Sequence, residues 1–279
     1  MIDTHCHLTF PDFAGRTNAV LAEASAAGVT GAITISTTTH DCLEALAVAQ
    51  AHPNVWCSSG VHPLYADAED PRAVTRSAGQ SVHVWENLRR VAADAKCVAW
   101  GELGLDNHYA HPPRELQRRV LEEQLAMIAR WRGEGLAKPV VVHCRRAVPD
   151  LLPVLRASGL PADRFVFHCF TEGPAEARMV LDFGAWISFT GVVTFRNAPE
   201  VAEAALLVPA DRIMCETDAP YLSPEPVRST RPCEPAFVMH TARFLAALRG
   251  EAFADFERAV DANARRFFGL PPEAGTPRC

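Results

Sequence analysis

The feature of this sequence that most constrains its fold is a repeated alternation of short apolar segments with longer segments of helical spacing. Eight apolar segments are predicted to be strands. They span residues 1–5, 31–36, 55–61, 97–102, 139–143, 164–168, 185–189 and 212–216. Several are continuous apolar runs, such as the three valines at 140–142. Such runs are typical of parallel strands that other elements cover on both faces.

Segments with helical spacing separate these predicted strands. They span residues 14–27, 40–51, 82–95, 113–133, 148–157, 174–183 and 199–207, and two more, 235–248 and 253–268, follow the last strand. Helices between consecutive strands predict βα units and a parallel sheet. Eight such units favour closure into an α/β fold of the (β/α)8 TIM-barrel type over an open doubly wound sheet.

The length and composition suit one barrel. The chain has 279 residues, of which 48% are hydrophobic, so it can bury a large core. Barrels of about 250 residues commonly form one domain. We expect a single domain over residues 1–270 and a tail at 271–279, and residues 66–81 are predicted to be a loop.

Residues of the types that bind metals lie at the carboxyl ends of five predicted strands. In a barrel these strand ends meet at one rim. The candidate ligands are His5, His7, Glu102, His143, His168 and Asp218. Because side chains alternate along a strand, His5 and His7 face the interior together, whereas Cys6 faces the helix layer. Four imidazoles and two carboxylates suit two divalent ions, with Zn²⁺ or Mn²⁺ favoured over Ca²⁺.

The two carboxylates of this set are predicted to be catalytic. Glu102 is placed to bridge two ions about 3.5–4 Å apart, and Asp218 is placed to accept a proton from an activated water. Each residue taken alone also has a structural interpretation. Glu102 lies in a Gly-rich turn, and Asp218 precedes Ala-Pro as a helix N-cap would. The six side chains together favour the metal site.

Other polar residues near the same rim are predicted to contact substrate. They are His62, Arg145, Arg228 and Arg231. Arginine suits phosphate because its planar guanidinium forms two parallel hydrogen bonds. The alternatives are a packed loop histidine for His62 and ordinary surface charges for the arginines. Asp106 follows the fourth strand and is expected to orient a ligand imidazole.

Seven blocks of sequence resemble the TatD-type metal-dependent deoxyribonucleases. They are IDTHCHL at 2–8, GVHP at 60–63, GELGLD at 101–106, VHCR at 142–145, HCF at 168–170, SFTG at 188–191 and ETDAPYL at 216–222. The resemblance implies a TIM barrel with two divalent ions (Zn²⁺, Mn²⁺ or Mg²⁺) at the six candidate ligands. It also implies hydrolysis of phosphodiester bonds in DNA, often from a 3′ end, with His62 and the basic residues after the last strand at the substrate.

The chain departs from this family outside the candidate ligands. Cys233 stands where the family usually has Asn, and Cys144 and Arg146 stand where Ser and Asp are frequent. The substrate preference is therefore open.

Charge and cysteine usage limit the partners and the compartment that we expect. The net charge of −6 disfavours a protein that coats long duplex DNA, but it allows binding of DNA ends or a small phosphodiester. Nine cysteines without a CxxC pair indicate a reducing compartment. With no secretory leader and no apolar run of about 18 residues, we expect a cytoplasmic protein without membrane contact. A monomer is favoured, but the sequence leaves the oligomeric state open.

Two other functions remain possible at the same rim. An amidohydrolase or aminoacyl-tRNA deacylase would cleave C–N or C–O bonds, but many amidohydrolases bridge their ions with a carbamylated lysine on strand four. Here that place holds Glu102, and the nearest lysine, Lys96, is expected at the opposite end of the strand. A non-catalytic metal-binding barrel is disfavoured because all six candidate ligands are present.

Overall fold

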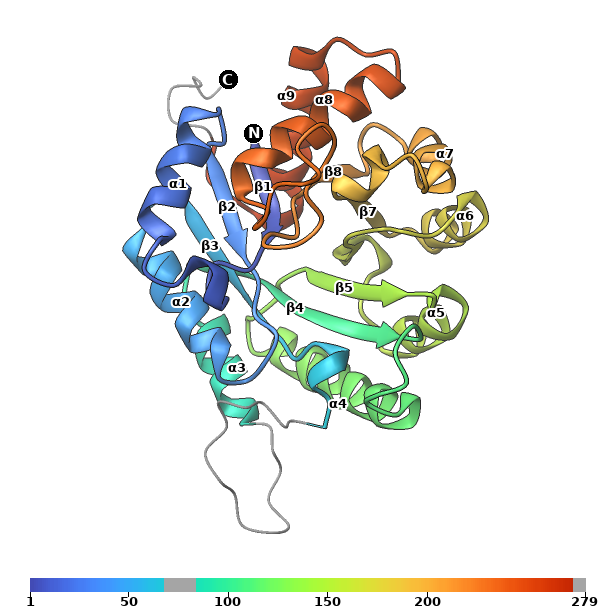
Figure 1. The fold of residues 1–279 in the computed structure, drawn as a ribbon. Coiled ribbons are helices and arrows are strands. Elements are labelled where there is room, and N and C mark those ends of the chain that lie inside the picture. The colour runs from blue at the N-terminus through green and yellow to red at the C-terminus, as the bar shows by residue number, and fades with distance from the viewer. Residues whose placement is uncertain (68–83, 273–279) are drawn as a thin grey trace.

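Eight parallel strands form one sheet in chain order, and the sheet curves into a barrel (Figure 1). The computed structural model describes residues 1–67 and 84–272. The strands are β1 Ile2–Cys6, β2 Gly31–Thr34, β3 Val55–Ser59, β4 Cys97–Asp106, β5 Val140–Arg145, β6 Phe165–Phe167, β7 Trp186–Phe189 and β8 Ile213–Cys215. Beyond β8, the Asp218 N–H donates to the His5 carbonyl (2.8 Å) and the His7 N–H donates to the Ala219 carbonyl (2.7 Å). These bonds bring the two edges together, and the predicted TIM barrel is confirmed.

Helices surround the sheet, and each lies within a few residues of its predicted segment (Figure 1). They are α1 Thr17–Ala26, α2 Asp41–Ala51, α3 Trp85–Ala92, α4 Arg114–Gly133, α5 Val148–Ala157, α6 Pro174–Phe183, α7 Pro199–Leu207, α8 Val238–Leu248 and α9 Phe253–Phe268. On α4 the buried apolar residues include Leu121, Leu125 and Ile128, which recur at helical spacing and face the sheet. The predicted loop at 66–81 and the predicted tail at 271–279 lie mostly outside the described residues.

The helix α9 covers the amino-terminal end of the barrel. The Ile2 N–H at the start of β1 donates to Asp261 Oδ1 (2.7 Å), and Asn263 Nδ2 donates to the Ile213 carbonyl at the start of β8 (2.9 Å). The Phe267 ring packs beside Trp186, with ring centroids 5.2 Å apart. Because this end is closed by apolar packing, the polar side chains at the other strand ends face an open rim.

The strand β4 is longer than predicted. We expected it to end at Glu102, but it continues to Asp106 and pairs with β5 along that length. Glycines on both sides of Glu102 resemble a turn in the sequence. In the structure the pairing with β5 shifts by one residue between Trp100 and Leu103, as in a β-bulge. Bulges re-aim side chains, and Glu102 lies at this one.

Close approach of β4 and β5 leads to a prediction about stability. A Cβ atom added to Gly104 would lie 1.8 Å from the His143 carbonyl oxygen. We expect Gly104→Ala to lower the free energy of unfolding by about 1–3 kcal/mol, because the strands must separate to accept the methyl group. Urea denaturation measures this change. Gly133→Ala is the control, since a Cβ there meets nothing within 4 Å. Equal stability of the two variants would contradict the prediction.

Candidate metal centre

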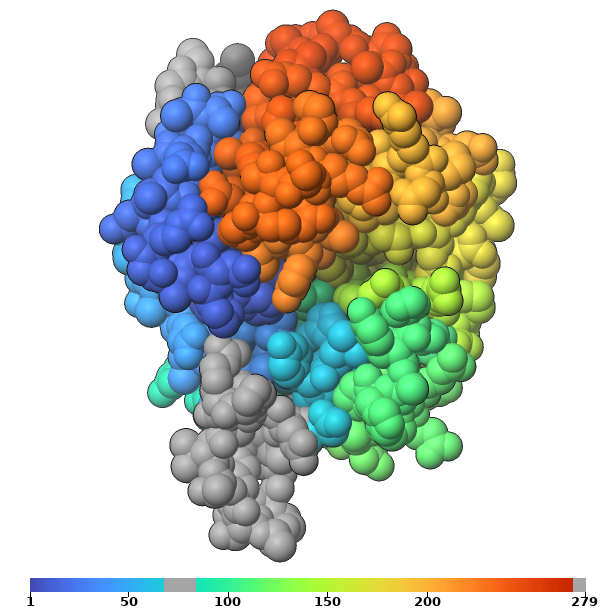
Figure 2. All heavy atoms as spheres, in the orientation of Figure 1, coloured from blue at the N-terminus to red at the C-terminus, as the bar shows by residue number. Residues whose placement is uncertain are grey.

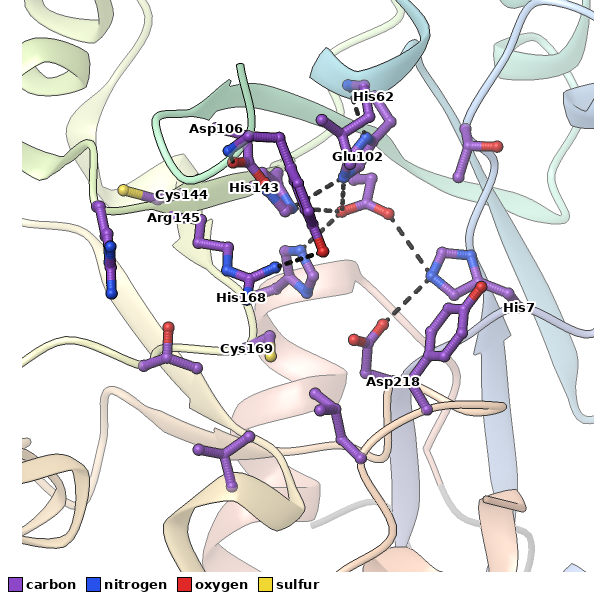
Figure 3. A pocket seen from close by; sticks show the side chains of 18 of the residues that line it. His7, His62, Glu102, Asp106, His143, Cys144, Arg145, His168, Cys169 and Asp218 are labelled. Carbon is purple, nitrogen blue, oxygen red and sulfur yellow. Dashed lines mark hydrogen bonds and ion pairs between the residues drawn. The ribbon is translucent and has the colours of Figure 1, made fainter. Parts of the chain in front are cut away.

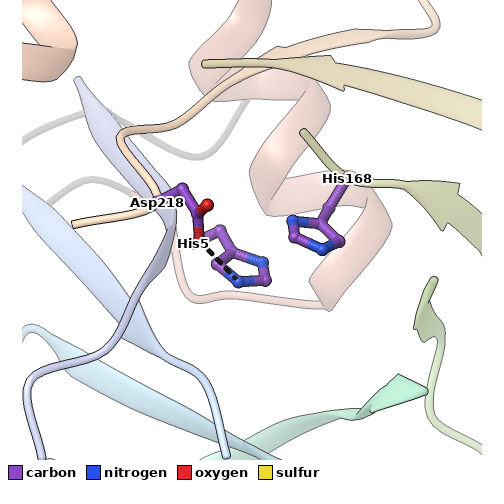
Figure 4. A group of neighbouring side chains, drawn as sticks. All are labelled: His5, His168 and Asp218. Atoms are coloured by element: carbon purple, nitrogen blue, oxygen red, sulfur yellow. Dashed lines mark ion pairs between the residues drawn. The ribbon is translucent and has the colours of Figure 1, made fainter. Parts of the chain in front are cut away.

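The predicted ligands converge at the open end of the barrel (Figure 3). Within the described residues, three overlapping groups of three side chains have ligand atoms within 4.8 Å of one another. The groups are His5, His168 and Asp218 (Figure 4); His5, His7 and Glu102; and His62, Glu102 and His143. All six candidate ligands are included, and His62 joins them as a seventh. Side chains spread from residue 5 to residue 218 thus form one cluster.

The Glu102 carboxylate occupies the centre of this cluster and is 2% exposed. Its Oε1 lies 3.7 Å from His5 Nε2 and 3.6 Å from His7 Nε2. Its Oε2 lies 2.7 Å from His168 Nε2 and 3.4 Å from His143 Nδ1. The two oxygens therefore face two different pairs of imidazoles, which is the arrangement that a carboxylate shared by two ions requires.

Asp218 closes the cluster on the side of β1. Its Oδ1 lies 3.2 Å from His7 Nε2 and 3.5 Å from His5 Nε2. The His5 ring also stacks on His168, with centroids 3.9 Å apart and planes 6° apart (Figure 4). Figure 3 shows Asp218 and His7 on one side of Glu102, and Asp106 and His143 on the other.

Unpaired polar atoms show that this cluster fits divalent cations. Glu102 Oε2 and His168 Nε2 are buried, and neither forms a hydrogen bond although they lie 2.7 Å apart. His7 Nδ1 lies 3.1 Å from the Ile35 carbonyl, to which it can donate its hydrogen, so Nε2 presents a lone pair. His7 Nε2 lies 3.3 Å from His5 Nε2. A cation among these atoms would satisfy Glu102 Oε2 and His168 Nε2, which have no hydrogen-bond partner.

The electrostatics of the cluster also favour cations. Burial alone would raise the pKa of Glu102, but the surrounding imidazoles, foremost His62 and His168, hold this pKa well below its usual range. Burial lowers the pKa of His168, yet the Glu102 charge outweighs burial and raises it well above the usual value. Burial lowers the pKa of His62 to about 3, so that ring is neutral at neutral pH. Metal ions would replace the protons that the carboxylates attract.

Two further carboxylates support the imidazoles from behind. Asp106 Oδ2 lies 3.1 Å from His143 Nε2, so that His143 can turn Nδ1 toward Glu102, as expected for a residue that orients a ligand. Glu216 Oε1 lies 3.6 Å from His168 Nδ1 and also accepts the Cys169 N–H (2.6 Å). Glu216 was not among the site residues predicted from the sequence. The signal in the sequence was its position, since this charged residue ends the apolar predicted strand 212–216.

These supporting contacts predict an effect on metal affinity. We expect Asp106→Asn and Glu216→Gln each to weaken metal binding by about 10–100-fold, because the imidazole behind each loses its anionic partner. Competition with a chelating dye measures the affinity. Glu122→Gln is the control, since Glu122 is exposed on α4 and pairs with Arg118. Wild-type affinity in both supporting variants would show that packing alone orients the rings.

Two buried glutamines of α4 hold the rim in place. Gln117 accepts the Asp106 N–H (2.8 Å) and donates to the Asp106 carbonyl (3.1 Å). Gln124 accepts the Val61 N–H (2.8 Å) and donates to the Val61 carbonyl (3.0 Å). The helix thereby positions Asp106 and the neighbour of His62. Neither glutamine was among the site residues predicted from the sequence. Their seven-residue spacing on an otherwise apolar helix face was the only signal.

The cluster lies in the wall of a cavity of about 1010 Å³. His62 and Arg145, two of the residues that the sequence predicts to contact substrate, line this cavity, whereas Arg228 and Arg231 are not among its lining residues. The Arg228 guanidinium lies 3.7 Å from the centroid of the Phe195 ring. Arg231 donates to the carbonyls of Arg228 and Thr230. Arg228 thus contacts the segment between β7 and α7, and Arg231 contacts its own loop after β8.

The positions that depart from the family pattern divide between the cavity and the core. Cys144 and Arg146 line the cavity, where they can affect a bound molecule. Cys233 is fully buried, and its N–H donates to the Pro220 carbonyl (2.9 Å). Any effect of Cys233 on substrate binding would therefore act through the loop between β8 and α8.

Left-handed backbone at non-glycine residues concentrates at this cavity. In the part of the chain that the structure describes, the residues concerned are Arg146, Cys169, Asp218 and Leu222. All of them line the cavity. Such conformations cost about 1–3 kcal/mol each and persist where the surrounding structure imposes them, commonly at functional sites.

Comparison with known proteins decides the family. The family model described as TatD related DNase matches residues 2–269. The chain belongs to this family. The TatD-related protein is 37% identical over 273 residues to the uncharacterized metal-dependent hydrolase YcfH of Escherichia coli K12, covering 97% of this chain and 96% of YcfH. It is 36% identical over 277 residues to the 3′-5′ ssDNA/RNA exonuclease TatD of Pantoea ananatis, covering 97% and 100% of the two chains.

A solved structure agrees with this assignment. The crystal structure of YjjV, a TatD homologue from Escherichia coli, superposes on this TatD-related protein with a TM-score of 0.85 and 28% identity, covering 97% of this chain and 98% of YjjV. The chain is therefore a metal-dependent hydrolase of the TatD family. None of the helices in residues 1–67 and 84–272 has the length and hydrophobicity that crossing a membrane requires.

Proposed function

We propose that this TatD-related protein hydrolyses phosphodiester bonds at DNA strand ends, from the 3′ end, with two divalent ions at the six candidate ligands. The observation that carries the proposal is the position of Glu102, whose two oxygens face two separate pairs of imidazoles. The relative in Pantoea ananatis, which is named a 3′-5′ ssDNA/RNA exonuclease, supports the choice of bond. The imidazole-rich ligand set favours Zn²⁺ or Mn²⁺ over Mg²⁺.

Divalent ions at this cluster would polarise a phosphate oxygen and lower the pKa of a nearby water. Asp218 is the residue that we assign to accept the proton of that water. Its side chain is 15% exposed to the cavity, against 3% for Glu102, so water reaches it more readily. Burial by itself would raise the pKa of Asp218, but the contact with His7 and the nearby imidazoles lower it. The carboxylate is therefore ionised at neutral pH and can take up a proton.

His62 is assigned to the substrate because of its ring orientation. Its Nδ1 accepts the Leu64 N–H (3.0 Å), so the neutral ring carries its hydrogen on Nε2. That N–H points into the cluster, 3.0 Å from His143 Nδ1. His62 can therefore donate to a phosphate oxygen, whereas His7 presents a lone pair at the corresponding atom. The Arg145 guanidinium at the cavity wall supplies positive charge for the same phosphate.

The position of Lys96, the lysine nearest to Glu102 in the sequence, disfavours an amidohydrolase in which a carbamylated lysine bridges two ions. Lys96 Nζ donates to the carbonyls of His52, Pro53 and Val55 at the amino-terminal side of the barrel. It lies at the opposite end of β4 from the cluster, as the sequence predicted. Glu102 is thus the β4 residue available to bridge two ions.

The test uses purified protein, chelator-treated and reloaded with Mn²⁺, Zn²⁺ or Mg²⁺, on single-stranded DNA labelled at its 5′ end. We expect a ladder of products shortened from the 3′ end in the presence of at least one ion, and no ladder with chelator. Intact DNA with every ion, together with cleavage of an ester, an amide or an aminoacyl-tRNA, would reject the phosphodiesterase and favour the alternative bonds.

A further inference from the structure

Two exposed tyrosines line the cavity that holds the candidate metal centre. Among the described residues, the exposed large apolar side chains include two aromatic rings, Tyr109 (47% exposed) and Tyr221 (52% exposed). Both line the cavity. An aromatic ring that faces water inside a binding cavity offers a flat surface on which a planar ligand can stack.

Tyr221 extends the site on the side of Asp218. Its N–H donates to the Asp218 carbonyl (3.0 Å), so its backbone is tied to a candidate ligand. The Phe10 ring meets Tyr221 edge to face, with centroids 6.1 Å apart, and stacks on His7 at 4.5 Å with planes 19° apart. A continuous aromatic wall therefore runs outward from the cluster on this side.

Tyr109 extends the site on the side of Asp106. Its N–H donates to Asp106 Oδ1 (3.1 Å), the carboxylate that supports His143. The Arg145 guanidinium lies 5.2 Å from the centroid of the Tyr109 ring and 3.4 Å from the tyrosine hydroxyl. This side thus combines a ring with a cation that suits a phosphate. Asp106 and Asp218 lie on opposite sides of Glu102 in Figure 3, so the backbones of the two tyrosines are tied to opposite sides of the cluster.

We propose that Tyr221 with Phe10, and Tyr109 with Arg145, are stacking platforms for the two bases that flank the phosphate to be hydrolysed. This inference rests on the proposed phosphodiesterase function and adds which side chains would hold the bases of an unpaired strand end. Bases within a duplex are already stacked and paired, so they must separate before they can lie on these rings. The net charge of −6 also argues for stacking, because broad electrostatic attraction to the strand is weak.

The test compares strands with and without bases. The ion-loaded protein is mixed with a hydrolysis-resistant phosphorothioate strand of four thymidines, or with the same strand whose two 3′-terminal nucleotides lack bases, and Kd is measured by fluorescence anisotropy. The wild type is expected to prefer the complete strand by about 5–150-fold for each base, the equivalent of about 1–3 kcal/mol of stacking. Tyr221→Ala and Tyr109→Ala should each lose the preference due to one base.

Matched variants separate stacking from folding. Tyr221→Phe and Tyr109→Phe keep the ring and should keep the preference. Leu206→Ala on α7 removes an equally exposed apolar side chain outside the cavity lining and should bind both strands as the wild type does. Equal binding of both strands by the wild type, or equal weakening for both strands in the alanine variants, would overturn the platforms.

The hydrolysis of ordinary phosphodiester strands distinguishes the two proposals. Faster cleavage of the complete strand than of the strand lacking 3′ bases supports both. Cleavage of both strands at the same rate overturns the platforms and leaves the phosphodiesterase intact. Cleavage of neither strand with any ion overturns the phosphodiesterase itself.

Discussion

Replacing Glu102 with Gln is expected to lower kcat/KM by about 10³-fold or more, the equivalent of about 4 kcal/mol of lost transition-state stabilisation. The amide keeps the shape of the side chain but removes the anion at the centre of the imidazoles. Its NH₂ group also points a donor at atoms that should share a cation. We therefore expect bound metal to fall below two ions per chain, measured by mass spectrometry of the desalted protein alongside the rate.

A matched control tests whether the effect depends on the position of Glu102 or only on the loss of one negative charge. Glu122→Gln makes the same chemical change on the exposed face of α4, where the side chain is 51% exposed and pairs with Arg118. Its rate and metal content should equal those of the wild type. A Glu102→Gln protein that keeps both ions and the full rate would remove the central residue from the mechanism proposed here.

Replacing Asp218 with Asn is expected to lower kcat by about 10²–10⁴-fold, the usual contribution of a general base. Asn tolerates the left-handed backbone that Asp218 adopts, with φ 59°, so the loop should keep its shape. Its amide oxygen can still face His7, but it accepts a proton far less readily than a carboxylate. The decisive measurement is kcat at saturating substrate and saturating metal, because added metal compensates for weakened binding.

The Asp218 variant also has a matched control. Asp255→Asn alters a carboxylate that is 66% exposed on α9 and pairs with Arg258, at the closed end of the barrel. It should leave kcat unchanged. If Asp218→Asn recovers the wild-type kcat when metal is saturating, Asp218 serves as a ligand only, and the proton acceptor lies elsewhere.

Much of the fold was predictable because its signals are local. The apolar run at β5 and the helical spacing along α4 are encoded in neighbouring residues, and the structure reproduces both elements. The error at β4 has a physical cause. Glycines usually mark turns, but Gly104 in this strand permits close approach to the His143 carbonyl. Whether a glycine ends a strand or lets two strands approach depends on the partner strand.

The candidate site was predictable to the extent that short side chains remain near their strand ends. The histidines and carboxylates at the rim converge as expected because their few torsions leave them little reach. Arg228 and Arg231 behave differently, since long side chains can turn toward several partners. In the structure Arg231 binds carbonyls of its own loop, whereas Arg228 contacts Phe195 and Asn197 in the segment after β7. Neither arginine is among the residues that line the cavity.

The sequence by itself determined the number and order of the βα units and which residue types stand at the open rim, because periodicity and strand ends are properties of contiguous segments. Only the tertiary structure decided that a bulge aims Glu102 between two imidazole pairs, that Glu216 supports His168, and that two tyrosines extend from the cluster. These features depend on packing between segments distant in the chain, where distances of a few tenths of an ångström separate a contact from a clash.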